Sequence, residues 1–531
     1  MSVRAHGDDA VLGTLLARAG ERFGDRPYLS FALDARDVTF AEAADAAARV
    51  AGGLARLGVA PGDRVLLMLR NRVEFVLGWL GAATLGAAQV PVNVDYRGAF
   101  LEHLAATAAA RVMVVETDLL DAVEAALPRL PALQTVVVVG EARGLDGVRV
   151  VPFAELLAGD PRAPHAGRVS DPAAVHFTSG TSGVAKGAIV PNGAMRGLCR
   201  RNRELLGLGP DSVYLTELPL FHINAQMTVY GGLLTGGRAR IERRFSATAW
   251  LERVRASGAT HTSLLGVMLG FLLAQPEAPD DADNPLEVAW TVPYTTAASD
   301  TFRTRFGLER VVTSYGSTEL GMVARRGGPE DGEEGSAGRV DPECYEVLVA
   351  DESGAAVPPG EVGELLVRPR HPWTVAQQYV GMPGETIRAF RDLWFHTGDA
   401  VRLGEDGSLW FVDRYAERIR RRGENVASAE VERVLLEHPG VEDVAVVAVR
   451  ADGPGGEDEI KAVLVGSADA EAIWAWCDER LPYFAVPRYV EFVEALPKTP
   501  TAKVRKTELR EAGVTPRTAD RGTAPAGRGL R

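Results

Sequence analysis

Along the first 150 residues, short apolar runs alternate with segments whose apolar residues recur at helical spacing. The segment TFAEAADAAARVAGGLARLG begins with Thr39 and Glu42 at the spacing of a capping box and ends at Gly58, so it predicts a helix. The runs RVLLMLRN, AAQVPVNV, RVMVVET and LQTVVVVG predict buried strands, with a helix through Leu85 between the first two. Strands that alternate with helices are typical of a parallel sheet in an α/β fold.

The pattern changes twice further along the chain. The segment YEVLVADESGAAVPPGEVGELLVRP alternates apolar and polar residues around turns, which predicts a small antiparallel β unit. After Arg414, two helical and two strand-like segments predict a compact α+β unit: SAEVERVLLEHPG, DVAVVAVR, IKAVLVG and EAIWAWCDERL. We therefore predict a large multi-subdomain α/β domain over residues 1–413 and a small α+β domain over 414–510. Residues 511–531 have little to bury and predict a disordered tail.

Size and charge narrow the class of protein. A chain of 531 residues exceeds what one hydrophobic core normally serves, so more than one domain is expected. A net charge of -13 argues against a general nucleic-acid binder, which needs a basic surface. Three widely spaced cysteines indicate reduced thiols. The N-terminus lacks an apolar leader, and no long uncharged apolar run occurs. We expect a cytoplasmic protein without a membrane span.

The segment FTSGTSGVAKGAIV combines glycines, hydroxyls and one lysine. Glycines let backbone N–H groups converge, and hydroxyls donate to anionic oxygens, so the segment is typical of a phosphate-binding loop. It is not the common P-loop, because Ala185 and Gly187 flank the lysine. A Gly/Ser/Thr linker is the alternative. The candidate phosphate-binding residues are Thr178, Ser179, Gly180, Thr181, Ser182, Gly183 and Lys186.

Five segments together resemble one family. FTSGTSGVAKG, LPLFHINAQ, TSYGSTELG, WFHTGDAVRLGEDGSLWFVDR and PKTPTAKVRKTELR, in this order between about Thr39 and Arg510, resemble the adenylate-forming superfamily of acyl-CoA synthetases, carrier-loading adenylation domains and luciferases. LPLFHINAQ and VTSYGSTEL are most similar to the carnitine and medium-chain acyl-CoA ligase branch. The resemblance implies that a carboxylate attacks ATP to give acyl-AMP and pyrophosphate. A thiol, usually coenzyme A, then displaces AMP.

The resemblance also implies roles for individual residues. The loop from Thr178 to Lys186 would hold the β and γ phosphates, and Glu319, with Thr178, would bind Mg²⁺, a cation suited to oxygen ligands. Thr318 would reach the α-phosphate. The adenine and the ribose would be held by Tyr315, Gly316, Asp399 and Arg414. His222, Asn224 and Ser314 would line the acyl pocket, although a packed histidine explains His222 equally well.

Lys503 is the implied catalytic lysine. It would bridge the incoming carboxylate and the α-phosphate, where a cation at about 4 Å is worth roughly 4 kcal/mol at an effective dielectric constant near 20. The small domain would rotate between the half-reactions, so that this lysine leaves before the thiol enters. Arg418, Arg420, Arg421 and Arg422 would then meet the phosphates of coenzyme A, or they form a solvated face.

The chain departs from the family pattern at four places. Ala416 stands where the hinge usually carries Asp or Lys, Ala502 replaces a glycine, Ala185 replaces a proline, and TVPYTTAASD replaces the glycine-rich adenine segment. The first hypothesis is an acyl-CoA synthetase that uses Mg·ATP, a small or medium acid and coenzyme A. The second passes the activated group to a carrier-protein thiol, an amine or nitrite. The third is a non-catalytic nucleotide-binding relative. Homodimers are common in the family, so a homodimer is one expected assembly.

Overall fold

The computed structural model describes residues 11–32, 37–178, 185–292, 296–351, 353–414, 418–421, 424–450, 458–497, 504 and 506–522. The chain divides into two compact units. The first unit draws on residues up to Val94, on Ala105–His176 and on Gly187–Val412. The second draws on Asp95–Leu104, on Phe177–Lys186 and on the residues from Asp413 onward. The phosphate-loop segment is therefore grouped with the second unit.

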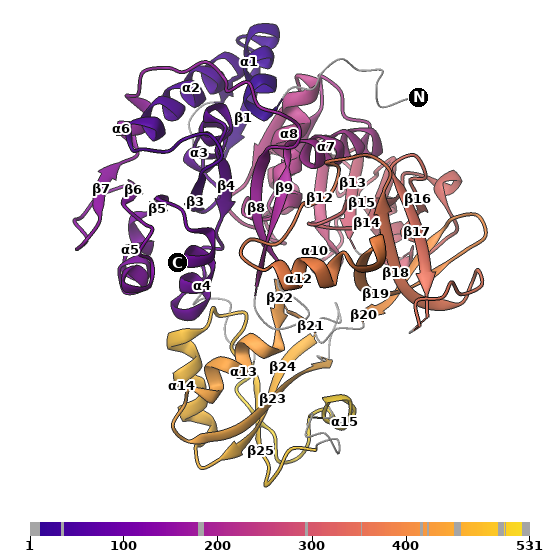
Figure 1. Cartoon of the computed structure of the whole chain (residues 1–531). Coiled ribbons are helices and arrows are strands. Elements are labelled where there is room, and N and C mark those ends of the chain that lie inside the picture. The colour runs from indigo at the N-terminus through magenta and orange to yellow at the C-terminus, as the bar shows by residue number, and fades with distance from the viewer. Residues whose placement is uncertain are drawn as a thin grey trace. The chain divides into compact units, whose positions relative to one another are not determined.

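A seven-stranded sheet forms the N-terminal part of the fold, in the order β7-β6-β5-β3-β4-β8-β9 (Figure 1). All pairs from β7 to β8 are parallel. The four predicted strands are β3, β4, β5 and β6, so the predicted parallel α/β sheet is confirmed. The strands are β3 (Arg64–Met68), β4 (Ala88–Pro91), β5 (Val112–Glu116), β6 (Thr135–Val139), β7 (Arg149–Pro152), β8 (Pro172–Thr178) and β9 (Lys186–Pro191).

Helices cover this sheet as the sequence pattern requires. Thr39 and Glu42 form the predicted capping box, which starts α2 at Phe40. The helix α3 is buried along almost its whole length, and it packs against α2, which in turn packs against α1 (Figure 1). The helices of this part are α1 (Leu12–Phe23), α2 (Phe40–Arg56), α3 (Val73–Leu85), α4 (Gly98–Ala108), α5 (Leu120–Ala126) and α6 (Ala154–Leu157).

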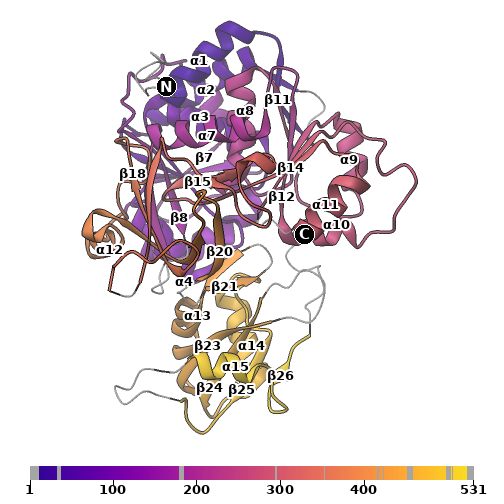
Figure 2. The same cartoon turned by 90° about the vertical axis from the view of Figure 1, so that its right-hand side faces the viewer.

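A nine-stranded sheet follows, in the order β16-β15-β14-β13-β12-β10-β11-β1-β2. Its strands from β14 to β1 pair in parallel, and β15 and β16 continue it antiparallel. Figure 2 shows α9, α10 and α11 gathered at one side of this sheet. The strands are β1 (Pro27–Phe31), β2 (Val38–Thr39), β10 (Val213–Thr216), β11 (Arg238–Ile241), β12 (His261–Leu265), β13 (Val288–Val292), β14 (Arg310–Ser317), β15 (Gly321–Arg326) and β16 (Arg339–Val340).

The helices of this second part are α7 (Asn192–Leu206), α8 (Ile223–Thr235), α9 (Trp250–Ser257), α10 (Gly266–Leu273) and α11 (Thr296–Arg305). The helix α8 joins the two sheets, because Gln226 on α8 accepts a hydrogen bond of 2.8 Å from Gln89 on β4. Apolar contacts support the same junction, since the rings of Trp79 and Tyr230 lie 5.3 Å apart. Both sheets therefore share one hydrophobic core.

The predicted antiparallel β unit is also confirmed. Strands β17 (Tyr345–Ala350), β18 (Val362–Pro369), β19 (Phe395–Leu403) and β20 (Leu409–Arg414) form a four-stranded sheet with its own apolar core. The pairs β17–β18 and β18–β19 are antiparallel, and the short helix α12 (Pro383–Ala389) lies between β18 and β19 in sequence. This sheet belongs to the first unit up to Val412.

The second unit contains the predicted helices and strands after Arg414, which confirms the predicted α/β architecture with a small C-terminal unit. Its elements are β21 (Arg418–Arg421), β22 (Glu424–Ala427), α13 (Ser428–Leu436), β23 (Val441–Arg450), β24 (Asp458–Gly466), α14 (Ala470–Arg480), β25 (Tyr489–Phe492), α15 (Lys506–Ala512) and β26 (Ala519–Asp520).

The predicted disordered tail over 511–531 is wrong for residues 511–522. The helix α15 extends through Ala512, and β26 pairs with β25. Two arginine–carboxylate pairs with two hydrogen bonds each hold this segment: Arg521 binds Asp478, and Arg488 binds Asp520. The segment has few apolar side chains to bury, and these ion pairs hold it in place instead. Residues 523–531 lie outside the described residues.

The three cysteines are free and buried, in agreement with the prediction of reduced thiols. No helix in the described part of the chain is both long enough and apolar enough to cross a membrane.

Candidate active site

A tight hairpin between β14 and β15 carries several of the predicted residues. Ser317 pairs with Gly321, so only three residues form the turn. Gly316 has to be a glycine here, because a Cβ on it would lie 1.9 Å from the carbonyl oxygen of Gly321. The pairing register shifts between Tyr315 and Gly316. Such an irregularity re-aims neighbouring side chains. Tyr315 lies next to it in β14, and Glu319 lies in the turn.

Tyr315 and Asp399 are brought together by the fold. The Tyr315 hydroxyl donates a hydrogen bond of 2.7 Å to Oδ2 of Asp399, and both residues are at most 9% exposed. Asp399 is positioned by the preceding turn in β19. Gly398 has a φ of 68°, and its N–H donates to Glu364, while the Asp399 N–H donates to the Thr397 hydroxyl. A buried carboxylate is thus oriented next to a phenol.

Glu319 lies in the turn and is 7% exposed. The Tyr379 hydroxyl donates to its Oε1 over 3.0 Å, and its backbone carbonyl accepts a hydrogen bond of 2.6 Å from the N–H of Ala376. These two contacts hold both the side chain and the main chain. Sequence reasoning missed Tyr379, because no spacing links it to a residue sixty positions earlier.

The donor set at Glu319 fits a magnesium ion that arrives with a nucleotide. Mg²⁺ commonly binds through one or two carboxylates and completes its shell with phosphate oxygens and water. Among the described residues, no group of three or more His, Cys, Asp or Glu side chains could hold a metal ion by itself. A metal at Glu319 therefore needs oxygen ligands from a substrate.

Ser314, a predicted pocket residue, contacts an indole. The Nε1–H of Trp290 on β13 donates to the Ser314 hydroxyl over 3.2 Å, and both side chains are buried. The indole hydrogen bond holds the serine side chain toward β13. Trp290 was not predicted from the sequence, since buried tryptophans occur in most large cores.

His222 and Asn224 lie at the start of α8. His222 is the N-cap residue of this helix, and its side chain makes no capping hydrogen bond; its ring packs 4.6 Å from that of Phe221. The backbone before it is clamped by Asn71, which accepts from the N–H of Leu220 and donates to the carbonyls of Leu218 and Glu242. The clamp makes the approach to α8 rigid.

A second histidine, His176, lies near His222 and was missed. It is 4% exposed on β8, two residues before Thr178, and its Nε2 has no hydrogen-bond partner among the described residues. Burial, together with a smaller effect of the nearby His222, lowers the pKa of His176 to about 3. His176 is therefore a neutral imidazole at physiological pH.

The phosphate-loop candidates are described only at their two ends. Thr178 ends β8, and Lys186 begins β9 with 9% exposure. Within the same unit, the N–H of Ala185 donates a hydrogen bond of 2.5 Å to Glu430, and burial raises the pKa of that carboxyl to about 7. Ser179, Gly180, Thr181, Ser182 and Gly183 lie outside the described residues, as do Lys503, Ala416 and Ala502. Arg414 is the last residue of β20.

Both predicted readings of the arginine run are wrong for Arg421. This residue is 4% exposed, donates to the carbonyls of Val486 and Phe484, and forms an ion pair of 2.6 Å with Glu459. A buried, paired guanidinium neither binds coenzyme A phosphates nor forms a solvated face. Arg422 lies outside the described residues.

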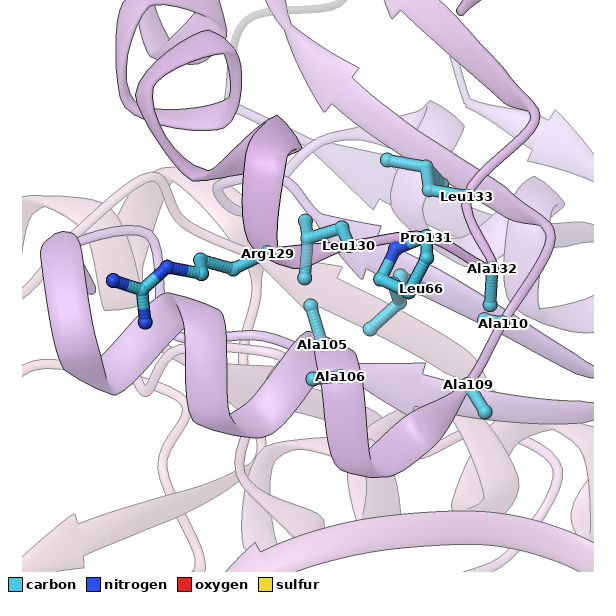
Figure 3. A pocket seen from close by; sticks show the side chains of 10 residues that line it. All are labelled: Leu66, Ala105, Ala106, Ala109, Ala110, Arg129, Leu130, Pro131, Ala132 and Leu133. Atoms are coloured by element: carbon cyan, nitrogen blue, oxygen red, sulfur yellow. The ribbon is translucent and has the colours of Figure 1, made fainter.

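A cavity of about 290 Å³ lies between the end of α4 and the segment before β6 (Figure 3). Its lining side chains are apolar apart from Arg129, and Leu66 of β3 forms part of the wall. None of the predicted site residues lines it. The cavity is therefore separate from the site built on β14 and β19.

Comparison with known families decides the class of the protein. Residues 16–380 match the family model described as AMP-binding enzyme, and residues 430–503 match the model of the AMP-binding enzyme C-terminal domain. The chain belongs to the AMP-binding enzyme family. The predicted membership of the adenylate-forming superfamily and the predicted class of AMP-forming ligase are thereby confirmed.

Individual relatives of this AMP-binding enzyme cover nearly the whole chain. A crotonobetaine/carnitine–CoA ligase from Salmonella enteritidis PT4 is 31% identical over 92% of this chain and 96% of the relative. The amide bond synthetase McbA from Marinactinospora thermotolerans is 26% identical with a TM-score of 0.78, covering 93% of this chain and 99% of that one. An o-succinylbenzoate CoA synthetase from Bacillus subtilis shares the fold, with a TM-score of 0.81 at 24% identity over 94% and 98%.

Proposed function

We propose that this AMP-binding enzyme activates a carboxylic acid with ATP to an acyl-AMP and transfers the acyl group to coenzyme A. The observation that carries the proposal is the β14 hairpin, which holds Tyr315 against Asp399 and Glu319 against Tyr379 in a chain of this family. The similarity to a CoA ligase over 92% of the chain supports the thiol acceptor.

The first half-reaction forms a P–O bond and breaks another. A carboxylate oxygen attacks the α-phosphorus, and pyrophosphate leaves with the electron pair of the broken bond. Two anions must approach each other, so positive charge and dipoles have to offset their repulsion. We assign this task to Lys503, to Thr318 at the α-phosphate and to the loop from Thr178 to Lys186 at the β and γ phosphates. Bound Mg²⁺ would neutralise phosphate charge beside Glu319, with Thr178 near it.

Nucleoside binding is assigned to the residues around Asp399. A carboxylate accepts hydrogen bonds from two neighbouring hydroxyls, as the ribose of ATP offers them. The Tyr315 hydroxyl donates to one oxygen of Asp399 and thereby orients the carboxylate. Gly316 is assigned to the adenine, and Arg414 is assigned to assist at the ribose.

The second half-reaction transfers the acyl group. The thiolate sulfur of coenzyme A attacks the acyl carbonyl, and AMP leaves with its phosphate oxygen. We propose that the C-terminal domain, residues 414–510, swivels between the two steps, so that Lys503 withdraws before the thiol enters. The expected homodimer and the cytoplasmic location stay predictions.

The acid is proposed to be small or medium in size. His222, Asn224 and Ser314 are assigned to its pocket, and the rigid approach to α8 would give that pocket a defined shape. The relative named crotonobetaine/carnitine–CoA ligase supports the inclusion of quaternary-ammonium acids among the substrates to be tested.

A second candidate function keeps the adenylation and changes the acceptor to an amine. The similarity to an amide bond synthetase over 93% of the chain favours this candidate, as do Ala416 at the hinge position and the altered adenine segment. A carrier-protein thiol and nitrite are further candidate acceptors.

The experiment has two stages. Pyrophosphate–ATP exchange is measured with aliphatic, aromatic and quaternary-ammonium acids, and acid-dependent exchange is expected for at least one class. The resulting acyl-AMP is then offered coenzyme A, a primary amine, nitrite or a phosphopantetheinylated carrier protein. Thioester formation with coenzyme A alone supports the first function, and amide formation without coenzyme A supports the second. Nucleotide binding without exchange for any acid would contradict both and support the non-catalytic relative.

A further inference from the structure

A buried arginine, Arg201, reaches the turn that carries Glu319 through one tyrosine hydroxyl. Arg201 lies on α7 and is 2% exposed, and Tyr345 begins β17 and is 1% exposed. Nη2 of Arg201 donates a hydrogen bond of 2.8 Å to the Tyr345 hydroxyl, which in turn donates one of 2.6 Å to the carbonyl of Leu320. The Leu320 carbonyl belongs to the peptide unit between Leu320 and Gly321, one residue after Glu319.

The burial of the Arg201 charge is energetically unfavourable, which indicates that this side chain has a role in the structure around it. Among the interactions of the described residues, no carboxylate forms an ion pair with Arg201; its other hydrogen-bond contact is the Cys344 sulfur at 3.5 Å, and its Nε lacks a partner. A buried guanidinium without a carboxylate is expensive, and such groups persist where they orient something else. Its guanidinium carbon lies 5.3 Å from the Tyr345 ring centroid, so a cation–π interaction offsets part of the unfavourable free energy of burial.

The turn is shaped to receive this contact. Gly321, which follows Leu320, has a φ of 72°, and a Cβ on it would come within 3.3 Å of Nη2 of Arg201. The Leu320 N–H is also held, because it donates to the Ser317 hydroxyl over 3.2 Å. A cation polarises the phenol that it donates to, which strengthens the next hydrogen bond in the chain. Both backbone polar groups of Leu320 are therefore held.

We propose that Arg201 is a positioning residue that holds the Glu319 turn, through the Tyr345 hydroxyl, in the geometry that receives Mg·ATP. The inference rests on the proposed function in one respect, namely that Glu319 faces the metal of the nucleotide. Arg201 and Tyr345 touch no substrate in this role. They act on the backbone next to Glu319, whereas Tyr379 acts on its carboxylate.

The test compares two tyrosine-to-phenylalanine variants. Tyr345→Phe removes the hydroxyl and keeps the ring. Tyr28→Phe is the matched control, because the Tyr28 hydroxyl is also buried and also donates to a backbone carbonyl, that of Val229 at 3.0 Å. Binding of ATP is measured by calorimetry with Mg²⁺ and with EDTA. Tyr345→Phe is expected to weaken Mg·ATP binding about tenfold and to leave binding in EDTA nearly unchanged. Tyr28→Phe should change neither.

A double-mutant cycle tests whether Arg201 acts through the hydroxyl. Arg201→Met alone should weaken Mg·ATP binding to a similar extent, and adding it to Tyr345→Phe should cause little further loss, because the hydroxyl is already gone. If Arg201→Met does not fold, Tyr345→Phe carries the test alone. Equal losses with Mg²⁺ and with EDTA, or the same response in Tyr28→Phe, would overturn the inference. Absence of acid-dependent exchange in the unaltered enzyme would contradict the proposed function, while the binding data still decide the role of Arg201.

Discussion

The hydroxyl of Tyr379 lies 3.0 Å from the carboxylate of Glu319, and both side chains are buried. This contact orients the only acidic side chain of the turn at 318–320. A hydrogen bond to a charged group is worth about 1.5–3 kcal/mol, so its loss is large enough to measure.

Tyr379→Phe is therefore expected to lower kcat/KM for adenylation by roughly ten- to hundredfold, since the carboxylate loses its orientation. Acid-dependent pyrophosphate–ATP exchange at varied Mg²⁺ concentration measures the effect, and a higher Mg²⁺ requirement is expected. Thioester formation from supplied acyl-AMP should be nearly unchanged, because pyrophosphate and its metal have already left. A loss of equal size in both half-reactions would show that Tyr379 merely supports the fold.

Asp399→Ala is expected to remove the preference for ribose over deoxyribose. If Asp399 binds the ribose hydroxyls, the unaltered enzyme should use ATP better than 2′-deoxy-ATP, by about tenfold for one hydrogen bond to a charged acceptor. The variant should use both nucleotides poorly and about equally. The KM values of the two nucleotides in the exchange assay give the comparison. A preserved preference in Asp399→Ala would contradict the assignment.

Lys503→Ala is expected to lower acyl-AMP formation by nearly a thousandfold, from the roughly 4 kcal/mol assigned to its charge. The thioester-forming step should proceed largely as before from supplied acyl-AMP. Lys506→Ala is the matched control, because the Lys506 ammonium binds the Ser428 hydroxyl and Glu432, each at 2.8 Å, within the second unit. The control should lose stability and keep the ratio of the two half-reaction rates.

His176→Leu is expected to reduce acid sensitivity. The pKa of His176 is about 3 in the folded protein and near 6.5 when unfolded, so the unfolded state binds more protons between these pH values. Its contribution to stability is complete above pH 6.5 and is lost as the pH falls, at about 1.4 kcal/mol per pH unit. Leucine takes up no proton. Urea unfolding at pH 7.5 and pH 5.0 should show a smaller loss for the variant, and equal losses would contradict the buried, neutral state.

The local sequence was sufficient to predict α2 and the strands β3, β4, β5 and β6. Thr39 and Glu42 satisfy each other's backbone across one helical turn, so the start of α2 could be predicted from residues three positions apart. The apolar runs of β3, β4, β5 and β6 are buried whatever their order, which is why the parallel sheet could be predicted as well.

Residues 511–522 show where a prediction of disorder from composition fails. Residues 511–522 have few apolar side chains, yet Arg521 finds Asp478 forty-three positions earlier and Arg488 finds Asp520 thirty-two positions later. A bidentate ion pair cannot be recognised from the local hydrophobicity of either segment. The sequence could not show which of its many charges would meet.

The sequence by itself was sufficient to predict the family and the fold class, both of which are confirmed, because these depend on residue types and on short spacings. The roles that it implies for individual side chains stay predictions. Only the tertiary structure decided that Tyr315 orients Asp399 across 84 positions, that Tyr379 orients Glu319 across 60, and that Arg201 reaches Tyr345 across 144. Such contacts form when separate elements pack their buried faces, and the hydrogen bond that results is a property of the packed pair rather than of either segment.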